Sequence, residues 1–373
     1  MPTKAVTHAL AAIGGALLMS LGWWFWGSAS SVDLSRPYPA QGVAGPASAW
    51  STLPNADFPI PPFAEHLKGV RIVLDPGHGG RASKKGWKVG PTGLREAEVN
   101  LAVAQHLRDF LVAVGADVHM VRDGDYYLDP DISADNRQRV EMANGMNADL
   151  FLSLHHNGVE SPTPNYTSVW YHGTPEHDSA SRCAARYLLS GLNDTLRLDS
   201  HLPCGVLSDT LMGPRGFLVL REATVPAVLC EASFFTNPDE ENRLRDPVYN
   251  RREAYGYFIG LARWAQAGLP RVALLEPDDG RVKAGGAVLI GLDDGLQGRG
   301  GWGSDRVRIA EDSIRVRVNE RPVEFTADMK KGRLRVMLPR GLTGGTARVF
   351  VDFENTFGQH VLHPYLTVRI TGR

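Results

Sequence analysis

Between about Lys68 and Leu269, segments with the apolar pattern of buried strands alternate with segments of helical period. The apolar run at 149–155 (DLFLSLH) suits a central strand, whereas residues 96–114 repeat apolar side chains every three or four positions. Strands that alternate with helices in this way form a sheet that is mainly parallel and covered by helices on both faces. We therefore expect an α/β domain over residues 68–269, with a mixed, largely parallel sheet flanked by helices.

The same patterns predict the individual elements of this domain. Strands are expected at 71–74, 116–122, 149–155, 168–172, 217–220 and 226–231. Helices are expected at 96–114, 134–147, 178–196 and in a last region that ends near residue 267. Asn237 opens this last region, because a capping side chain followed by a proline and three acidic residues is typical of a helix start.

The pattern changes after Leu269. Residues 271–373 contain short β-type runs, such as AVLIGL and ARVFVDF, separated by Gly, Asp and Asn turns, and no helical period is present. About a hundred residues with roughly seven short strands are typical of a β-sandwich. We expect a small all-β domain of immunoglobulin-like type over 271–373, without a catalytic cluster.

The N-terminal part predicts export. No charged residue lies between Lys4 and Asp33, and the chain is apolar from about Ala9 to Trp26. Residues 1–30 are therefore interpreted as a signal peptide or a membrane anchor, with these two alternatives open. Residues 31–67, rich in Pro, Ala and Ser, are interpreted as a linker. The expected location is the periplasm or cell envelope, with anchoring in the inner membrane if the segment is not cleaved.

Charge and cysteine content exclude several classes of protein. The 40 basic and 41 acidic residues give a net charge of -1, which does not favour binding to nucleic acid. Three widely spaced cysteines, Cys183, Cys204 and Cys230, do not form a dense disulfide framework or a zinc knuckle. A Cys183–Cys204 pair stays open in an oxidising compartment.

Four ionisable residues lie at the ends of expected strands or at the start of a helix. His78 follows the strand RIVL on a Pro-Gly turn, and His155 ends the strand at 149–155. Glu96 opens a helix after a Gly-Pro-Thr-Gly turn, and Glu231 ends the strand PAVLCE. Sites in α/β sheets form where strand ends meet, so these side chains are candidates for one site.

Two histidines and a carboxylate from three separate loops match an open zinc site, in which the fourth position is left to water. A second carboxylate nearby could take a proton from that water and pass it to a leaving amine. Each residue alone also has an ordinary structural interpretation; Glu96, for example, could simply be an acid in the first turn of a helix. His156 competes with His155, and only one of them should face the site because side chains alternate along a strand.

Four segments occur in the order IVLDPGHGG, GPTGLREAEVNLAVA, RVEMANGMNADLFLSLHHN and VPAVLCEASFFTNPDEE. With these motifs the chain resembles the amidase_3 family of zinc-dependent N-acetylmuramoyl-L-alanine amidases, which are bacterial cell-wall hydrolases. The resemblance extends over about residues 70–267, which is more than half of the chain. The family fold, a mixed sheet flanked by helices, agrees with the elements expected above.

The resemblance implies that one zinc ion is held by His78, Glu96 and His155, with Glu231 as the catalytic acid/base. It selects Glu96 over Glu98 as the ligand. It also implies that zinc-activated water attacks the amide between the lactyl group of N-acetylmuramic acid and L-alanine of the stem peptide, so the expected partner is peptidoglycan. Asp75 is expected to orient the His78 turn or His78 itself.

Two features depart from the family pattern. The loop after the Gly-His-Gly-Gly turn is long and basic, where the family usually has acidic and small residues; its cations are Arg81, Lys84, Lys85 and Lys88. His156 stands where a small residue is common, and the resemblance selects His155 rather than His156 as the ligand. Neither departure removes a ligand.

Two other functions stay open. A zinc peptidase that cuts within the stem peptide would use the same ligands and the same base. A non-catalytic wall-binding protein is the third hypothesis, although the complete set of four site residues favours an enzyme. Region 271–373 is expected to serve domain packing, wall attachment or binding of a protein partner.

Overall fold

The computed structural model describes residues 58–80, 88–174, 178–198, 205–297 and 307–371. The predicted signal or anchor at 1–30 lies outside the described residues, together with most of the predicted linker and the basic loop before Lys88. Within the described ranges, no helix combines the length and the apolar character that are needed to cross a membrane.

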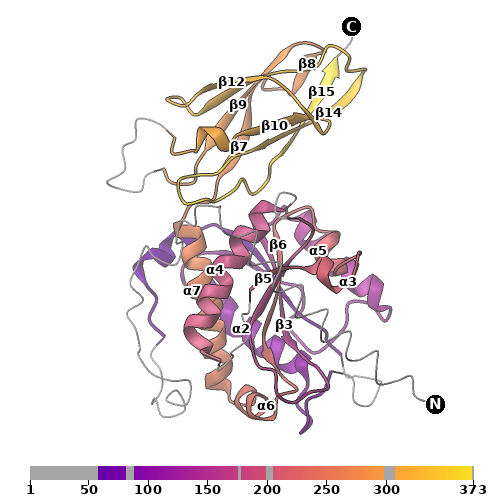
Figure 1. Ribbon diagram of the computed structural model, residues 1–373, viewed down its shortest axis with the longest axis vertical. Helices are drawn as coiled ribbons and strands as arrows, with labels where there is room; N and C mark the ends of the chain where they lie inside the picture. Colours follow the sequence, from indigo (N-terminus) through magenta and orange to yellow (C-terminus); the bar gives the residue numbers. More distant parts are fainter. Residues whose placement is uncertain (1–57, 81–87, 175–177, 199–204, 298–306, 372–373) are drawn as a thin grey trace, which may run out of the picture. The chain divides into compact units, whose positions relative to one another are not determined.

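A six-stranded mixed sheet forms the centre of the first folded region (Figure 1). Its order is β2-β1-β3-β6-β4-β5, and every neighbouring pair is parallel except the antiparallel pair of β4 and β6. The strands are β1 (Arg71–Pro76), β2 (Asp117–Met120), β3 (Leu150–Asn157), β4 (Ser168–Tyr171), β5 (Val206–Ser208) and β6 (Ala227–Phe234). The predicted mixed, largely parallel sheet is confirmed.

Helices cover both faces of this sheet (Figure 1). One face carries α2 (Glu96–Ala113), α4 (Ser179–Leu196) and α7 (Pro247–Gln266), and the other carries α3 (Ile132–Gly145) and α5 (Leu218–Arg221). Side chains of β3 alternate between the two cores: Leu152 and Leu154 lie in the core below α2 and α7, and Phe151 lies in the core below α3. Because both faces are covered, β3 is a buried apolar strand.

The last helical region of this domain consists of two helices. Asn237 caps α6 (Pro238–Leu244) by accepting hydrogen bonds from two backbone amides, those of residues 239 and 240. Asp246 then caps α7 by accepting from the amide of Val248. Pro247 stands at the first position of α7, where a missing N–H costs nothing, and it cannot continue the preceding helix.

The expectation of a strand at 217–220 is wrong, since this segment forms the short helix α5. Val219 and Leu220 are both buried, whereas the residues on either side of them are less so. Two successive buried positions do not alternate as they would in a half-buried strand. A four-residue apolar run is too short to reveal its period, so the sequence did not distinguish these cases.

The folded α/β region begins before the predicted linker boundary at residue 67. Residues Pro62–Leu67 form a 3-10 helix, η2, in which Ala64 and Leu67 are fully buried in the core of the α/β region. Phe58 packs against Phe110 of α2 at a ring-centroid distance of 6.2 Å. The apolar side chains in this Pro-rich stretch therefore belong to the folded domain.

Residues beyond 270 form two sheets of five and four strands, with orders β11-β10-β14-β15-β8 and β12-β13-β9-β7. Their strands are β7 (Arg271–Glu276), β8 (Arg281–Lys283), β9 (Ala287–Asp293), β10 (Arg315–Val318), β11 (Arg321–Pro322), β12 (Phe325–Asp328), β13 (Arg333–Met337), β14 (Gly345–Asp352) and β15 (Tyr365–Thr371). Side chains from both sheets share one buried core. The β-rich character of this region is confirmed, and the immunoglobulin-like type stays a prediction.

The described cysteines are buried and free. Cys183 lies on α4 and Cys230 on β6. Burial raises the pKa of the Cys183 thiol to about 11, so this thiol is protonated at neutral pH and is a poor nucleophile. Cys204, the other member of the pair that the sequence left open, lies outside the described residues.

Candidate metal centre

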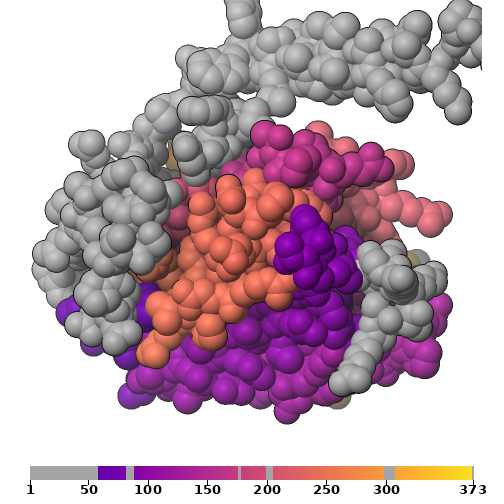
Figure 2. Space-filling view, turned by 90° about the horizontal axis from the view of Figure 1, so that it is seen from below, coloured from indigo at the N-terminus to yellow at the C-terminus, as the bar shows by residue number. Residues whose placement is uncertain are grey.

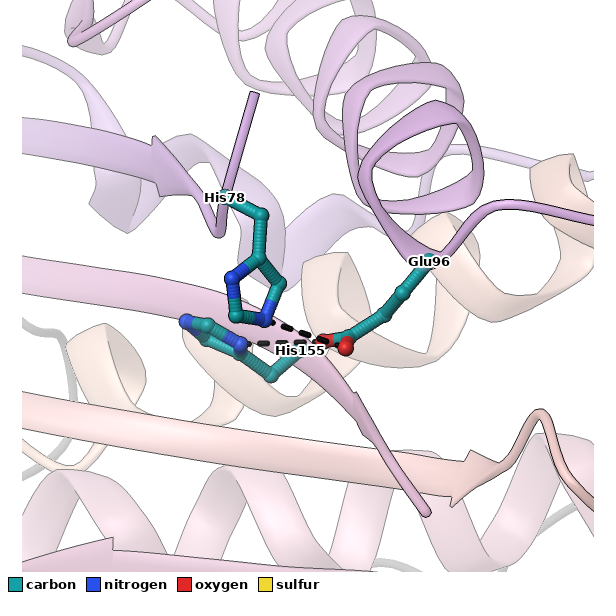
Figure 3. Close-up of side chains that lie close together, drawn as sticks. All are labelled: His78, Glu96 and His155. Carbon is teal, nitrogen blue, oxygen red and sulfur yellow. Dashed lines mark hydrogen bonds and ion pairs between the residues drawn. The ribbon is translucent and has the colours of Figure 1, made fainter. Parts of the chain in front are cut away.

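Three predicted site residues converge at one edge of the sheet (Figure 3). One ligand atom from each of His78, Glu96 and His155 lies within 4.8 Å of the other two. Nε2 of His78 is 3.0 Å from Oε2 of Glu96, and Nδ1 of His155 is 3.0 Å from Oε1 of Glu96. The two imidazole rings meet edge to face, with centroids 4.8 Å apart.

The sheet topology explains this convergence. β1 and β3 are parallel neighbours, so the turn after β1 and the end of β3 meet at the same edge. His78 occupies this turn in a left-handed conformation with φ of 59°. Gly77 lies directly against the ring of His155, where a Cβ atom would overlap the imidazole. A glycine at 77 is therefore required for the two histidines to approach each other.

Two buried arginines hold the turn by its carbonyl groups. Arg122 donates from Nη2 to the carbonyl oxygen of Gly77 at 2.9 Å, and Arg139 donates from Nη2 to that of His78 at 2.7 Å. Arg139 also pairs with Asp75 at 2.8 Å. Arg122 and Arg139 are 0% and 1% exposed, so these contacts are shielded from water.

Asp75, predicted to orient the turn or His78, contacts Arg139 and accepts from the hydroxyl of Ser153 at 2.7 Å. Burial favours the neutral carboxyl, but the charge of Arg139 and the bond from Ser153 outweigh it, so the pKa of Asp75 is lowered. Asp75 thus stays ionised and holds Arg139 beneath the turn. Asp75 therefore acts on the position of His78 indirectly, because it holds Arg139, which in turn binds the carbonyl group of His78.

Glu96 is the buried centre of the cluster, with an exposed fraction of 1%. Burial alone would raise the pKa of its carboxyl, but His78 and His155 outweigh this effect and hold it well below the usual range. Oε1 accepts hydrogen bonds from the amide of His156 at 3.2 Å and from Nδ2 of Asn100 at 3.3 Å. The protein therefore satisfies one oxygen of this carboxylate.

The other oxygen of Glu96 shows that the cluster fits a metal ion. Oε2 of Glu96 and Nε2 of His78 are buried and form an ion pair at 3.0 Å, but neither atom makes a hydrogen bond in the described part of the chain. Buried polar atoms without a hydrogen bond are costly and call for an explanation. Two imidazoles and one carboxylate are the donor set of a catalytic zinc site, and an ion between them would satisfy both atoms.

Glu231 lies beside this cluster. It is the register partner of His155 across the parallel pair of β3 and β6, so both side chains leave the same face of the sheet. Its Oε2 is buried and lacks a hydrogen-bond partner among the described residues. Burial first, and then the negative charge of Glu96, raise the pKa of Glu231 to about 8. The carboxyl can thus exchange a proton near neutral pH.

His156 points away from the cluster. It is 2% exposed and lies on the face of β3 that is covered by α2 and α7. Nδ1 of His156 lies 2.8 Å from Oδ1 of Asn100, and Nε2 lies 3.0 Å from Oε2 of Glu253 on α7. Burial acts to lower the pKa of His156, but Glu253 outweighs it and the pKa is raised.

The segment before Glu96 is fixed by a helix far away in sequence. Glu241 on α6 accepts hydrogen bonds from the backbone amides of Thr92 at 2.9 Å and Leu94 at 3.0 Å. In Figure 2, the dark violet residues of this segment lie against the coral residues of α6 and α7. This attachment sets the point at which α2 begins and thereby the position of Glu96.

A small pocket adjoins the cluster on the side of His78. Lys88 and Arg95 contribute cationic side chains to its wall, and Tyr127 contributes an aromatic ring. Arg95 is already paired with Asp125 at 2.8 Å, so its charge is partly balanced. Lys88 is the described member of the predicted basic loop, and it is exposed.

Four residues of this centre were not recognised from the sequence: Asn100, Arg122, Arg139 and Glu253. Asn100 follows Glu96 by four positions and so lies on the same helix face, which was a usable signal. Glu253 lies on α7 between the buried Tyr249 and Tyr257, and an acid within such an apolar stripe was a second signal. The arginines resembled ordinary surface residues in the sequence.

Comparison with known proteins gives one family. Residues 72–263 match the model of Amidase_3, described as N-acetylmuramoyl-L-alanine amidase. The germination-specific N-acetylmuramoyl-L-alanine amidase of Bacillus subtilis is 31% identical over 212 residues, covering 54% of this chain and 83% of that protein. The N-acetylmuramoyl-L-alanine amidase AmiA of Escherichia coli is 30% identical over 230 residues, covering 52% of this chain and 75% of that protein.

Among solved structures, the catalytic domain of CwlV, an N-acetylmuramoyl-L-alanine amidase from Bacillus (Paenibacillus) polymyxa var. colistinus, is similar. It is 29% identical, with 51% of this chain and 94% of that chain covered and a TM-score of 0.43.

Proposed function

Because this chain belongs to the Amidase_3 family of N-acetylmuramoyl-L-alanine amidases, we propose that it cleaves peptidoglycan at the amide between N-acetylmuramic acid and L-alanine, using zinc and the carboxyl of Glu231. The observation that carries the proposal is the convergence of His78, Glu96 and His155, in which Nε2 of His78 and Oε2 of Glu96 are buried and make no hydrogen bond within the described residues. Glu231 lies beside them on the neighbouring strand.

His78, Glu96 and His155 would hold the zinc ion. When bound, zinc supplies Lewis-acid chemistry, which polarises an amide carbonyl and makes water a better nucleophile at neutral pH. The chain's own contribution is to keep the three side chains together. Three features restrict the positions of these side chains. They are the two arginines that hold the turn, the close contact of Gly77 with His155, and the hydrogen bonds to Oε1 of Glu96.

Glu231 moves the proton in this reaction. Its carboxylate takes a proton from the water that attacks the lactyl carbonyl carbon, and a C–O bond forms. The C–N bond to L-alanine then breaks, and the carboxyl of Glu231 gives its proton to the departing amino group. A pKa raised to about 8 suits a group that must accept and release a proton near neutral pH.

The enzyme acts outside the cytoplasm in this proposal. The support is the sequence of residues 1–30, in which Lys4 is followed by a long apolar stretch without charged residues, as is typical of a signal peptide or membrane anchor. Fractionation of cells that produce the full chain, with immunodetection, tests this point. Recovery of the protein with the cytoplasm would contradict export.

The experiment that tests the reaction is digestion of purified peptidoglycan, followed by identification of the new chain ends. New amino termini on L-alanine, together with muramic acid that carries a free lactyl carboxylate, are expected. Cuts between two amino acids of the stem peptide would instead identify a peptidase. Absence of cleavage by zinc-loaded protein would support a wall-binding role.

A further inference from the structure

A row of buried polar contacts leads from α7 to the carboxylate of Glu96. Oε2 of Glu253 lies 3.0 Å from Nε2 of His156, whose Nδ1 lies 2.8 Å from Oδ1 of Asn100. Nδ2 of Asn100 then donates to Oε1 of Glu96 at 3.3 Å. Three elements, α7, β3 and α2, thus meet in one hydrogen-bonded relay.

Hydrogen-bond chemistry fixes the direction of each link. Nδ2 of Asn100 faces two oxygens, that of Glu96 and the carbonyl oxygen of Gly77 at 3.2 Å, so the nitrogen must be on that side. Oδ1 therefore faces His156, and because this oxygen only accepts, Nδ1 of the imidazole donates to it. The carboxylate of Glu253 accepts from the opposite ring nitrogen. Asn100 consequently has one favourable orientation.

Helix packing alone does not explain these residues. Glu253 and Asn100 are 0% exposed and His156 is 2% exposed. Burying such polar groups costs several kcal/mol unless they are paired, and apolar residues of similar volume would pack α7 against the sheet at least as well. The relay ends on Glu96 of the candidate metal cluster, which indicates that the buried polar groups serve this cluster.

We propose that Glu253, His156 and Asn100 are positioning residues for the zinc ligand Glu96. They hold Oε1 of Glu96 through the amide of Asn100, and they leave Oε2 turned towards Nε2 of His78. Asn100 also holds the carbonyl of Gly77, so the same amide restrains the turn that carries His78. This inference rests on the proposed zinc site.

Zinc affinity of the purified full chain, measured by competition with a chromophoric chelator, tests the relay without measuring activity. Glu253→Ala removes the partner of His156 and should weaken zinc binding about 10- to 100-fold, the usual effect of losing an outer partner of a metal ligand. Glu253→Gln keeps a side chain that can hydrogen-bond Nε2 of the imidazole, as donor or acceptor, so its zinc affinity should stay near that of the wild type.

A double replacement separates positioning from folding. Glu253→Ala leaves a buried imidazole unpaired and can unfold the protein, whereas Glu253→Leu with His156→Leu replaces the whole pair by apolar side chains. The double variant should fold, yet it should bind zinc as weakly as Glu253→Ala because Asn100 is no longer held. Circular dichroism and the melting temperature of the metal-free proteins monitor folding.

Glu240 provides the matched control, because it is a fully buried carboxylate on α6 that bonds Tyr249 at 2.8 Å and Arg243 at 2.6 Å. Glu240→Gln should lower stability and leave zinc affinity unchanged. A folded double variant with wild-type zinc affinity would overturn the relay, as would an equal loss of affinity in Glu240→Gln. A wild-type protein that binds no zinc would overturn the metal site itself, and the relay with it.

Discussion

His155 on β3 and Glu231 on β6 are register partners across a parallel pair of strands, so their side chains project from the same face at neighbouring positions. The main-chain hydrogen bonds of the sheet thus set the separation between an imidazole of the candidate metal centre and a carboxyl with a pKa raised to about 8. Two groups with different roles are held by rigid strands rather than by loops. This arrangement suits a reaction that needs both groups at fixed positions.

Glu231→Gln should abolish most of the amidase activity and leave the metal in place. An amide cannot exchange a proton as a carboxyl does, so kcat on purified peptidoglycan should fall about 10²- to 10⁴-fold. Zinc content should match the wild type, because Glu231 is outside the ligand set. A variant with wild-type kcat would show that another group moves the proton.

Arg139→Ala should destabilise the protein by about 3 to 5 kcal/mol, since it leaves the buried carboxylate of Asp75 without its cation. Denaturant unfolding monitored by the far-ultraviolet signal measures this change. Arg137→Ala is the control on the same helix: its side chain is 52% exposed and lies 3.4 Å from Glu222. This control should change stability by less than about 1 kcal/mol.

Gly77→Ala should weaken zinc binding, because the added methyl group would overlap the ring of His155 and displace it. Gly145→Ala, at the end of α3, meets no atom within 4 Å and should leave the affinity unchanged. Chelator competition measures both variants. Equal affinities for the two would show that the site tolerates movement of His155.

Stability should depend on pH through His360 in the C-terminal β region. Its Nδ1 lies 2.8 Å from Asp352 and its Nε2 lies 3.4 Å from Glu354. Burial lowers the pKa of His360, but these carboxylates outweigh it and raise the pKa from 6.5 to about 9. The raised pKa stabilises the folded state by on the order of 3 kcal/mol, and this stabilisation is fully present below the unfolded pKa and lost as pH rises through about 9.

Comparison of the wild type with His360→Asn tests this dependence. The wild type should be the more stable protein at about pH 6, and the difference in unfolding free energy should shrink by about pH 10. A difference in unfolding free energy that stays constant from about pH 6 to about pH 10 would mean that the imidazole of His360 does not titrate in this pH range.

The sequence predicted the fold where elements are long enough to show a period. The run from Leu150 to Leu154 and the helix from Glu96 to Ala113 were predicted because their apolar patterns extend over many residues. Some short elements were not: α5 was mistaken for a strand, and strands of two or three residues such as β11 and β8 carry too few side chains to define a face.

The family was predicted from motifs around His78, Glu96, His155 and Glu231, and it is confirmed. These residues were recognisable because they end strands or open a helix, where sites of α/β sheets form. Glu253 could not be connected with Glu96 in the same way. Its proposed role depends on the packing of α7 against β3, which brings Glu253 to His156 across 97 positions of sequence.

The most direct test of the central claim is a zinc determination on the purified full chain and on His78→Ala, with folding checked by circular dichroism. One equivalent of zinc in the wild type and little or none in the folded variant is the expected result, because His78 is one of the three proposed ligands. A wild-type protein without zinc, or a full equivalent retained by His78→Ala, would contradict the assigned metal centre.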